Sequence, residues 1–153
     1  MSDAWQPHVV VAALVERDGR YLIVEEFING ELRLNQPAGH WEQGETLLDA
    51  VKRETLEEAA WEIEPRAFLG TYIWHPNSLP YPFVRFAFIA DAIRHHPDRK
   101  LDQGIVRALW LTPEELRARR GEWRSPSVIQ CIEDYQAGRR YPLDLVREQV
   151  EAR

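Results

Sequence analysis

The stretch that most constrains this chain is residues 39–61, where an amphipathic helix carries glutamates on its apolar side. Residues 46–60 contain no Gly or Pro and are rich in Leu, Ala, Glu and Lys, which are good helix formers. Thr46, followed by Asp49, resembles a capping box and marks the start of this helix. Because helical positions about seven apart lie nearly in line, one stripe is predicted to be buried. It comprises Leu47, Leu48, Val51, Thr55 and Ala59.

Three glutamates of this helix, Glu54, Glu57 and Glu58, are spaced so that they cluster on one face. A solvated acidic face is the simplest interpretation. However, Glu54 and Glu58 each follow a residue of the buried stripe by seven positions, so both lie along that stripe. Inward-facing acids are costly unless they are paired or bind metal, and clustered carboxylates raise one another's pKa. We therefore predict a divalent cation with oxygen ligands, Mg²⁺ or alternatively Mn²⁺.

The loop before the helix is consistent with a metal-bound anionic substrate. Gly39 and Gly44 permit tight backbone geometry, and the Gly39 carbonyl could supply a further oxygen ligand. The N-terminus of the helix also attracts a phosphate group.

Charge and composition limit the classes of partner that we expect for this chain. The chain has 25 acidic and 19 basic residues, a net charge of −6, whereas nucleic-acid binding usually needs a basic surface. A single cysteine, Cys131, excludes an internal disulfide. No apolar stretch approaches the ~20 residues that span a bilayer, and the N-terminus MSDAWQPH does not look like a secretory signal. We expect a cytoplasmic protein with no nucleic-acid or membrane partner, as a monomer or homodimer.

The rest of the chain indicates one domain, residues 1–153, of the α/β or α+β class. Asp18-Gly19 is a hairpin turn signal between the first two strands. The expected strands are residues 8–16, 20–27, 32–38, 68–74, 83–91 and 106–111. Further helices are expected to begin at Thr112-Pro113 and at Ser125-Pro126, the latter ending near Gly138.

The spacing of the acidic segment resembles the Nudix box of the Nudix hydrolases. The matching positions are Gly39, Glu45, Arg53, Glu54, Glu57 and Glu58. The resemblance implies hydrolysis of a phosphoanhydride in a nucleoside diphosphate linked to some other group, and we expect a small phosphorylated substrate. It also implies the Nudix fold, a mixed β-sheet sandwiched between α-helices, with the box as a loop–helix–loop.

The resemblance further implies roles for these residues. Glu54, Glu57 and Glu58 would ligate the metal, assisted by the Gly39 carbonyl, and Glu54 is a candidate general base for the attacking water. Arg53 would orient the carboxylates. Glu45 would support the box and could bind a further metal.

The chain departs from the family pattern at three places. Ala60 stands where the family usually has Gly, and Thr55 where it has an aliphatic residue. Many members carry a glutamate before the strand that corresponds to residues 106–111. Only Asp102 could take that part, as a ligand or base; otherwise it is a turn residue.

Residues 7–26, 34–47 and 124–142 resemble the bacterial NudJ-type phosphatase subfamily. That subfamily's implied activity is removal of phosphate from nucleoside tri- and diphosphates and from hydroxymethylpyrimidine pyrophosphate, a thiamin precursor. A nucleotide-sugar or dinucleotide pyrophosphatase of the ADP-ribose type is the alternative enzyme. A non-catalytic nucleotide-sensing module is the alternative outside enzymes.

Substrate contacts are expected from the strand at residues 83–91 and the loop before it. Trp74 and Phe83 could stack on a ring, or simply pack in the core. Arg85, on the same strand face as Phe83, could bind a phosphate or form a structural ion pair. A solvated helix face is the expected setting of four arginines: Arg117, Arg119, Arg120 and Arg124.

Overall fold

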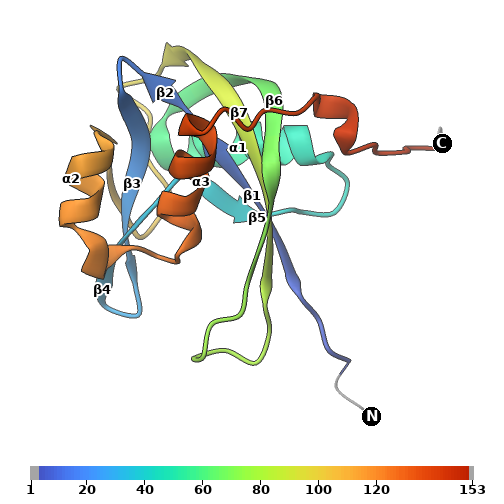
Figure 1. Cartoon of the computed structure of the whole chain (residues 1–153), viewed down its shortest axis with the longest axis horizontal. Coiled ribbons are helices and arrows are strands. Elements are labelled where there is room, and N and C mark those ends of the chain that lie inside the picture. The colour runs from blue at the N-terminus through green and yellow to red at the C-terminus, as the bar shows by residue number, and fades with distance from the viewer. Residues whose placement is uncertain (1–3, 152–153) are drawn as a thin grey trace.

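The computed structural model describes residues 4–151, and within them the strands form two four-stranded sheets (Figure 1). The first sheet has the order β5-β1-β7-β6 and is mixed, because β1 and β7 run parallel while its other pairs are antiparallel. Its strands are β1 (His8–Leu14), β5 (Ala38–His40), β6 (Trp61–Trp74) and β7 (Phe83–His95). In the second sheet β3 pairs with β2, β4 and β8. Its strands are β2 (Glu16–Arg17), β3 (Arg20–Ile28), β4 (Glu31–Asn35) and β8 (Ile105–Leu111).

Helices cover both outer faces of the strands. The helix α1 (Leu47–Ala59) packs on β6, β5 and β1, whereas α3 (Ser127–Gln136) packs on β6 from the other side together with α2 (Pro113–Ala118). Side chains alternate along each strand, so Phe88 of β7 belongs to the core under α1 and its neighbour Ile89 to the core under α3. Figure 1 shows α2 and α3 grouped together, away from α1. The expected sandwich of a mixed sheet between helices is confirmed.

The acidic helix forms as the sequence predicts. Thr46 is its N-cap and accepts a hydrogen bond from the Asp49 amide. Its C-cap, Ala60, lies in the left-handed region with φ 58°, a position that usually favours glycine. The family's usual Gly at this place is therefore explained, and the chain tolerates Ala there.

Several strands differ from the expectation: the residues expected as one strand at 8–16 divide between β1 and β2, and β7 runs on from 91 to His95. Residues 32–38 are not one strand, because β4 ends at Asn35 in the second sheet and β5 begins at Ala38 in the first. Pro37 lies at this crossing, where the chain leaves one sheet for the other. The strand expected at residues 68–74 begins earlier, at Trp61. Three register irregularities between β6 and β7 interrupt the alternation of side chains there, so the sequence pattern does not show the first part of the strand.

Two short 3₁₀ turns complete the chain, η1 (Arg120–Glu122) and η2 (Leu143–Leu145). Within residues 4–151 no helix is long and apolar enough to cross a membrane. Residues 1–3, part of the stretch that carries the cytoplasmic expectation, lie outside the described residues, as do residues 152–153. The single domain over residues 1–153 stays a prediction.

Candidate active site

The carboxylates of α1 meet the edge strand β5 at very close range. A Cβ atom on Gly39 would lie 2.1 Å from the carboxylate carbon of Glu54. Only a residue without a side chain permits this approach. Beside it, the Ala38 amide donates a 2.8 Å hydrogen bond to Oε1 of Glu58. Two of the three predicted metal ligands therefore contact β5: Glu54 packs against Gly39, and Glu58 accepts a hydrogen bond from Ala38.

Arg53 ties the box together. Its Nε and Nη2 donate to the two oxygens of Glu45 at 3.0 and 2.7 Å, and Nη2 also donates to the His40 carbonyl. Its Nη1 donates to Glu54 at 2.8 Å and to Glu57 at 3.3 Å. Hydrogen bonds from Arg53 lower the pKa of Glu45. This geometry supports the orienting role expected of Arg53 and the supporting role expected of Glu45.

Glu54 and Glu58 are buried, each with 8% of its surface exposed, so the solvated-face interpretation is wrong for both. Burial raises the pKa of Glu54 to about 7 and that of Glu58 to about 9, and neighbouring carboxylates add to both shifts. Burial also raises the pKa of Glu57. One arginine therefore does not compensate this cluster of acids.

Asp102 joins the cluster from the loop before β8. Its amide donates to the Glu57 carbonyl at 3.0 Å, and its charge raises the pKa of all three box glutamates. The structure thus places Asp102 where the resemblance required an acid, while its part as ligand or base stays a prediction.

The donor set suits a hard divalent cation, because it consists of carboxylate oxygens whose ionised forms lack a sufficient counter-charge. Within residues 4–151, however, no group of His, Cys, Asp or Glu side chains already converges as a closed set of ligands. Nη1 of Arg53 binds Glu54 and Glu57 in this arrangement. Binding a cation would require these two side chains to turn toward it.

The direction of the backbone carbonyls bears on the fourth expected ligand, the Gly39 carbonyl. Flanking hydrogen bonds join Ala13 to Pro37 and Trp41 to Val9, and Val11 is paired with Gly39 between them. In an antiparallel pair this alternation directs the carbonyl of Gly39 toward β1 and that of Ala38 toward the open edge. The role of the Gly39 carbonyl as a metal ligand stays a prediction. The Ala38 carbonyl, on the open edge near Glu58, is better placed for that role.

A cavity of about 380 Å³ opens beside the carboxylates. Glu54 and Glu58 lie at one part of its lining, and the three predicted substrate contacts, Trp74, Phe83 and Arg85, lie at another. The rings of Trp74 and Phe83 stack with centroids 5.7 Å apart. The structure therefore brings two of the three predicted glutamate ligands, Glu54 and Glu58, into one cavity with the predicted substrate contacts.

Arg85 is not part of a structural ion pair. It is 5% exposed, and its Nη2 donates to the amide oxygens of Asn35 and Gln36, both at 2.9 Å. Its buried Nε has no partner among the described residues. Burial lowers the pKa of Arg85. The neutral partners leave its positive charge available to a ligand in the cavity.

Glu26, Asn35 and Arg124 are among the residues that line the cavity without having been predicted as site residues. The solvated-face prediction is wrong for Arg124, whose guanidinium lies over Trp74 and Phe83 at 5.2 and 5.4 Å from their ring centroids. Arg124 was expected on a helix face, but it lies in the turn before α3. The turn is held to β4 by the bond from the Arg124 amide to the Leu34 carbonyl.

The comparisons with known proteins identify the family. The NUDIX domain profile matches residues 5–131. The chain belongs to the Nudix hydrolases. It is a hydrolase of phosphoanhydride bonds, and members of the family act on small phosphorylated substrates with a divalent metal.

Several relatives and solved structures are similar to this Nudix hydrolase over most of its length. Phosphatase NudJ of Shigella boydii and of Escherichia coli K12 are each 39% identical to it over 143 residues, covering 93% of this chain and 92% of the relative. A solved NUDIX hydrolase from Nitrosomonas europaea is 47% identical, with a TM-score of 0.92 over 94% of this chain and 98% of that one. A UDP-X diphosphatase structure, 18% identical with a TM-score of 0.72 over 90% of this chain and 67% of that one, shares the fold.

Proposed function

We propose that the chain is a Mg²⁺-dependent phosphohydrolase. It removes phosphate from nucleoside tri- and diphosphates and from hydroxymethylpyrimidine pyrophosphate. The observation that carries this proposal is the cavity that joins the buried carboxylates Glu54 and Glu58 to Arg85, whose Nε has no hydrogen-bond partner among the described residues. The likeness to Phosphatase NudJ over 93% of the chain supports phosphate as the group released.

Glu54, Glu57 and Glu58 would hold the metal, with a backbone carbonyl of β5 and with Mn²⁺ as a possible substitute. When bound, the cation supplies Lewis-acid polarisation of the phosphoryl oxygens. Glu54 accepts a proton from water as the water oxygen bonds to phosphorus. The anhydride P–O bond breaks, and the leaving phosphate keeps its electron pair. Without metal, burial raises the pKa of Glu54 to about 7; a bound cation would favour the ionised carboxylate, the form that accepts a proton.

Arg53 keeps the Glu54 and Glu57 carboxylates in position, and Glu45 fixes Arg53 in turn. Trp74 and Phe83 offer aromatic faces to a base or pyrimidine ring. Asp102 would act as a further ligand or as a second base. We also propose a cytoplasmic monomer or homodimer with no nucleic-acid or membrane partner.

A pyrophosphatase that cuts an internal anhydride, as in nucleotide sugars, dinucleotides or ADP-ribose, is the competing enzyme. The product mixture separates the two. We expect Mg²⁺-dependent release of inorganic phosphate from nucleoside diphosphates and hydroxymethylpyrimidine pyrophosphate. Two organic phosphates from ADP-ribose, with no inorganic phosphate from nucleotides, would favour the competing enzyme. Thermal stabilisation by nucleotide without any turnover would indicate a sensing module.

A further inference from the structure

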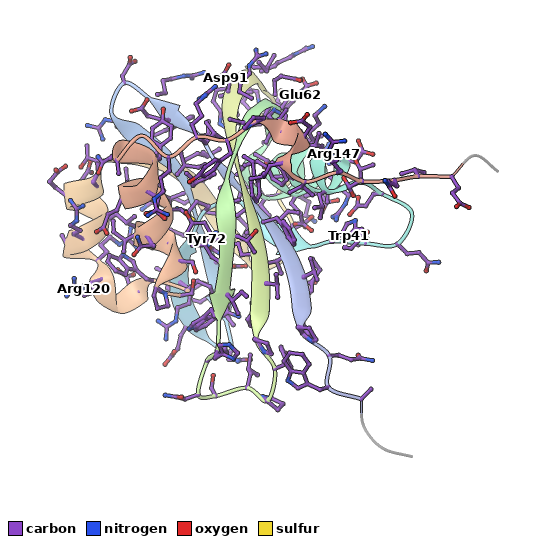
Figure 2. All side chains as sticks on the ribbon, turned by 45° about the vertical axis from the view of Figure 1, so that its right-hand side comes forward. Trp41, Glu62, Tyr72, Asp91, Arg120 and Arg147 are labelled. Carbon is purple, nitrogen blue, oxygen red and sulfur yellow. The ribbon has the colours of Figure 1, made fainter. Side chains whose placement is uncertain are left out.

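Arg85 and Asn35 lie together on the wall of the cavity and are held there from several directions. Arg85 projects from β7, where its row of the first sheet includes Val10 and Tyr72. Asn35 is the last residue of β4 in the second sheet. Figure 2 shows Tyr72 on the side of β6 that faces α3, where its hydroxyl donates to Asp134 at 2.7 Å. The Arg85–Asn35 pair therefore connects the two sheets at the cavity.

The hydrogen bonds fix which atoms this pair presents. Because a guanidinium only donates, the Asn35 atom 2.9 Å from Arg85 Nη2 must be the amide oxygen. The Nδ2 amino group of Asn35 is then directed away from Arg85. Gln36 is engaged at both ends of its amide, since its oxygen accepts from Arg85 and its Nε2 donates to the Val128 carbonyl at 2.7 Å. Arg85 and Asn35 therefore offer the cavity donors only.

The charge balance selects the kind of acceptor. Arg85 is buried, its hydrogen-bond partners are neutral, and Glu58 acts on it electrostatically without forming an ion pair with it. A buried cation without a directly bound acid is costly. A ring carbonyl would accept a hydrogen bond but leave the charge uncompensated, whereas a phosphoryl group supplies both acceptor oxygens and negative charge. Glu54 and Glu58 line the same cavity, so a substrate held there can reach both places at once.

We propose that Arg85 and Asn35 form a subsite for the phosphoryl group that the product retains, next to the phosphorus that is attacked. The proposal rests on the phosphohydrolase function and specifies its substrate as a chain of at least two phosphoryl groups. Free inorganic phosphate has the same chemistry and could occupy the subsite as well.

The test uses Asn35→Asp, with Asn77→Asp in the exposed loop between β6 and β7 as the matched control. The carboxylate introduced by Asn35→Asp would pair with Arg85 and repel a phosphoryl group. With a nucleoside diphosphate and Mg²⁺, we expect the KM of Asn35→Asp to rise at least roughly tenfold. Its Tm should stay equal to or above that of the wild type. Asn77→Asp should keep the wild-type KM. A KM within about threefold of the wild type for Asn35→Asp would overturn the proposal.

Inhibitor binding separates a phosphoryl subsite from recognition of the ring. A nucleoside monophosphate should bind Asn35→Asp and Arg85→Gln at least roughly tenfold more weakly than wild type, while the parent nucleoside binds all three alike. Equal weakening of the nucleoside would assign the pair to the ring and reject the subsite. Weaker competitive inhibition by inorganic phosphate in both variants would show that free phosphate also binds there. If the wild type releases no phosphate, the proposed function fails, but calorimetric binding of the monophosphate still decides the subsite.

Discussion

Gly39 and Glu54 approach so closely that a side chain on the first would occupy the space of the second. The Cβ of an alanine at position 39 would lie 2.1 Å from the Glu54 carboxylate carbon and 2.3 Å from each of its oxygens. Gly39 lies on the edge strand and Glu54 on the helix that packs against it. The glycine that begins the Nudix box thus has a steric reason that does not depend on backbone φ.

We predict that Gly39→Ala displaces the Glu54 carboxylate. Because catalysis depends on placement to within about 1 Å, kcat/KM should fall by roughly 100-fold. Overpacking should cost about 2 kcal/mol of unfolding free energy. Gly121→Ala is the control, since a Cβ there meets no atom within 4 Å. Steady-state kinetics and urea unfolding of both variants test this, and wild-type turnover by Gly39→Ala would contradict it.

Glu57→Gln tests the carboxylate cluster without removing its packing. Glu57 is half-buried and receives a hydrogen bond from Arg53, so the amide should preserve the fold while it removes a charged ligand. We expect kcat to fall by roughly 100-fold or more at saturating Mg²⁺, with an unchanged circular dichroism spectrum. Activity within about tenfold of the wild type would count against the assigned role.

Local signals predicted the acidic helix and its site well. The N-cap Thr46 and the heptad spacing of Glu58 after Val51 are short-range features, and both were enough to place α1 and its buried carboxylates. The surroundings of Arg85 could not be predicted from such local signals. Its partners Asn35 and Gln36 lie 50 and 49 residues earlier in the chain, and β4 and β5 belong to different sheets. No periodicity reports such a contact.

In the metal-free protein, the free energy of unfolding should fall as pH rises. An unfolded glutamate ionises near 4.5, whereas burial raises the pKa of Glu54 to about 7 and of Glu58 to about 9. Between these values the folded state binds more protons, so the unfolding free energy decreases with pH up to about 9. A cation favours the ionised carboxylates, so Mg²⁺ should raise Tm more at alkaline than at mildly acidic pH.

Glu58→Gln separates this effect from general charge repulsion. The variant should lose most of the decline in Tm between pH 7 and 9, because the group that ionises there is gone. Glu64→Gln, at an exposed position of β6, should keep the wild-type slope. A metal-free Tm that rises over this range would refute the assignment.

Glu25 should give the free energy of unfolding the opposite dependence on pH. It is 3% exposed and binds Arg119 at 2.9 Å and Arg107. Burial opposes its ionisation, but the two arginines outweigh it and lower the pKa below 4.5. Its stabilisation is therefore present above the pKa of an unfolded glutamate and is lost as pH falls through the folded value. The expectation that Arg119 lies on a solvated face was wrong, because Arg119 is partly buried and binds both the nearby Glu122 and the distant Glu25.

Because Arg107 is largely exposed, we expect Glu25→Gln to cost only about 1–2 kcal/mol at pH 7. The difference from wild type should shrink as pH falls below 4.5. Glu31→Gln, which breaks an exposed pair with Arg33, should cost less than about 0.5 kcal/mol. Urea unfolding at several pH values measures both, and equal costs for the two variants would contradict the prediction.

The C-terminal segment caps the acidic helix from a distance. Both carboxylate oxygens of Glu148 accept from the Leu47 amide, at 3.0 and 2.9 Å. Leu143 and Val146 pack against the core under α1, and Figure 1 shows the segment leaving α3 and crossing to the α1 side. A carboxylate at a helix N-terminus satisfies a free amide and interacts favourably with the helix dipole.

We predict that Glu148→Ala lowers the unfolding free energy by about 0.5–1 kcal/mol, and less at high salt, because the charge–dipole interaction is screened. Glu151→Ala, three residues further along the same segment and exposed, should have no measurable effect. Amide hydrogen exchange gives the sharper measurement, since the Leu47 amide should exchange faster in Glu148→Ala alone. Unchanged protection of that amide would show that the cap does not form in solution.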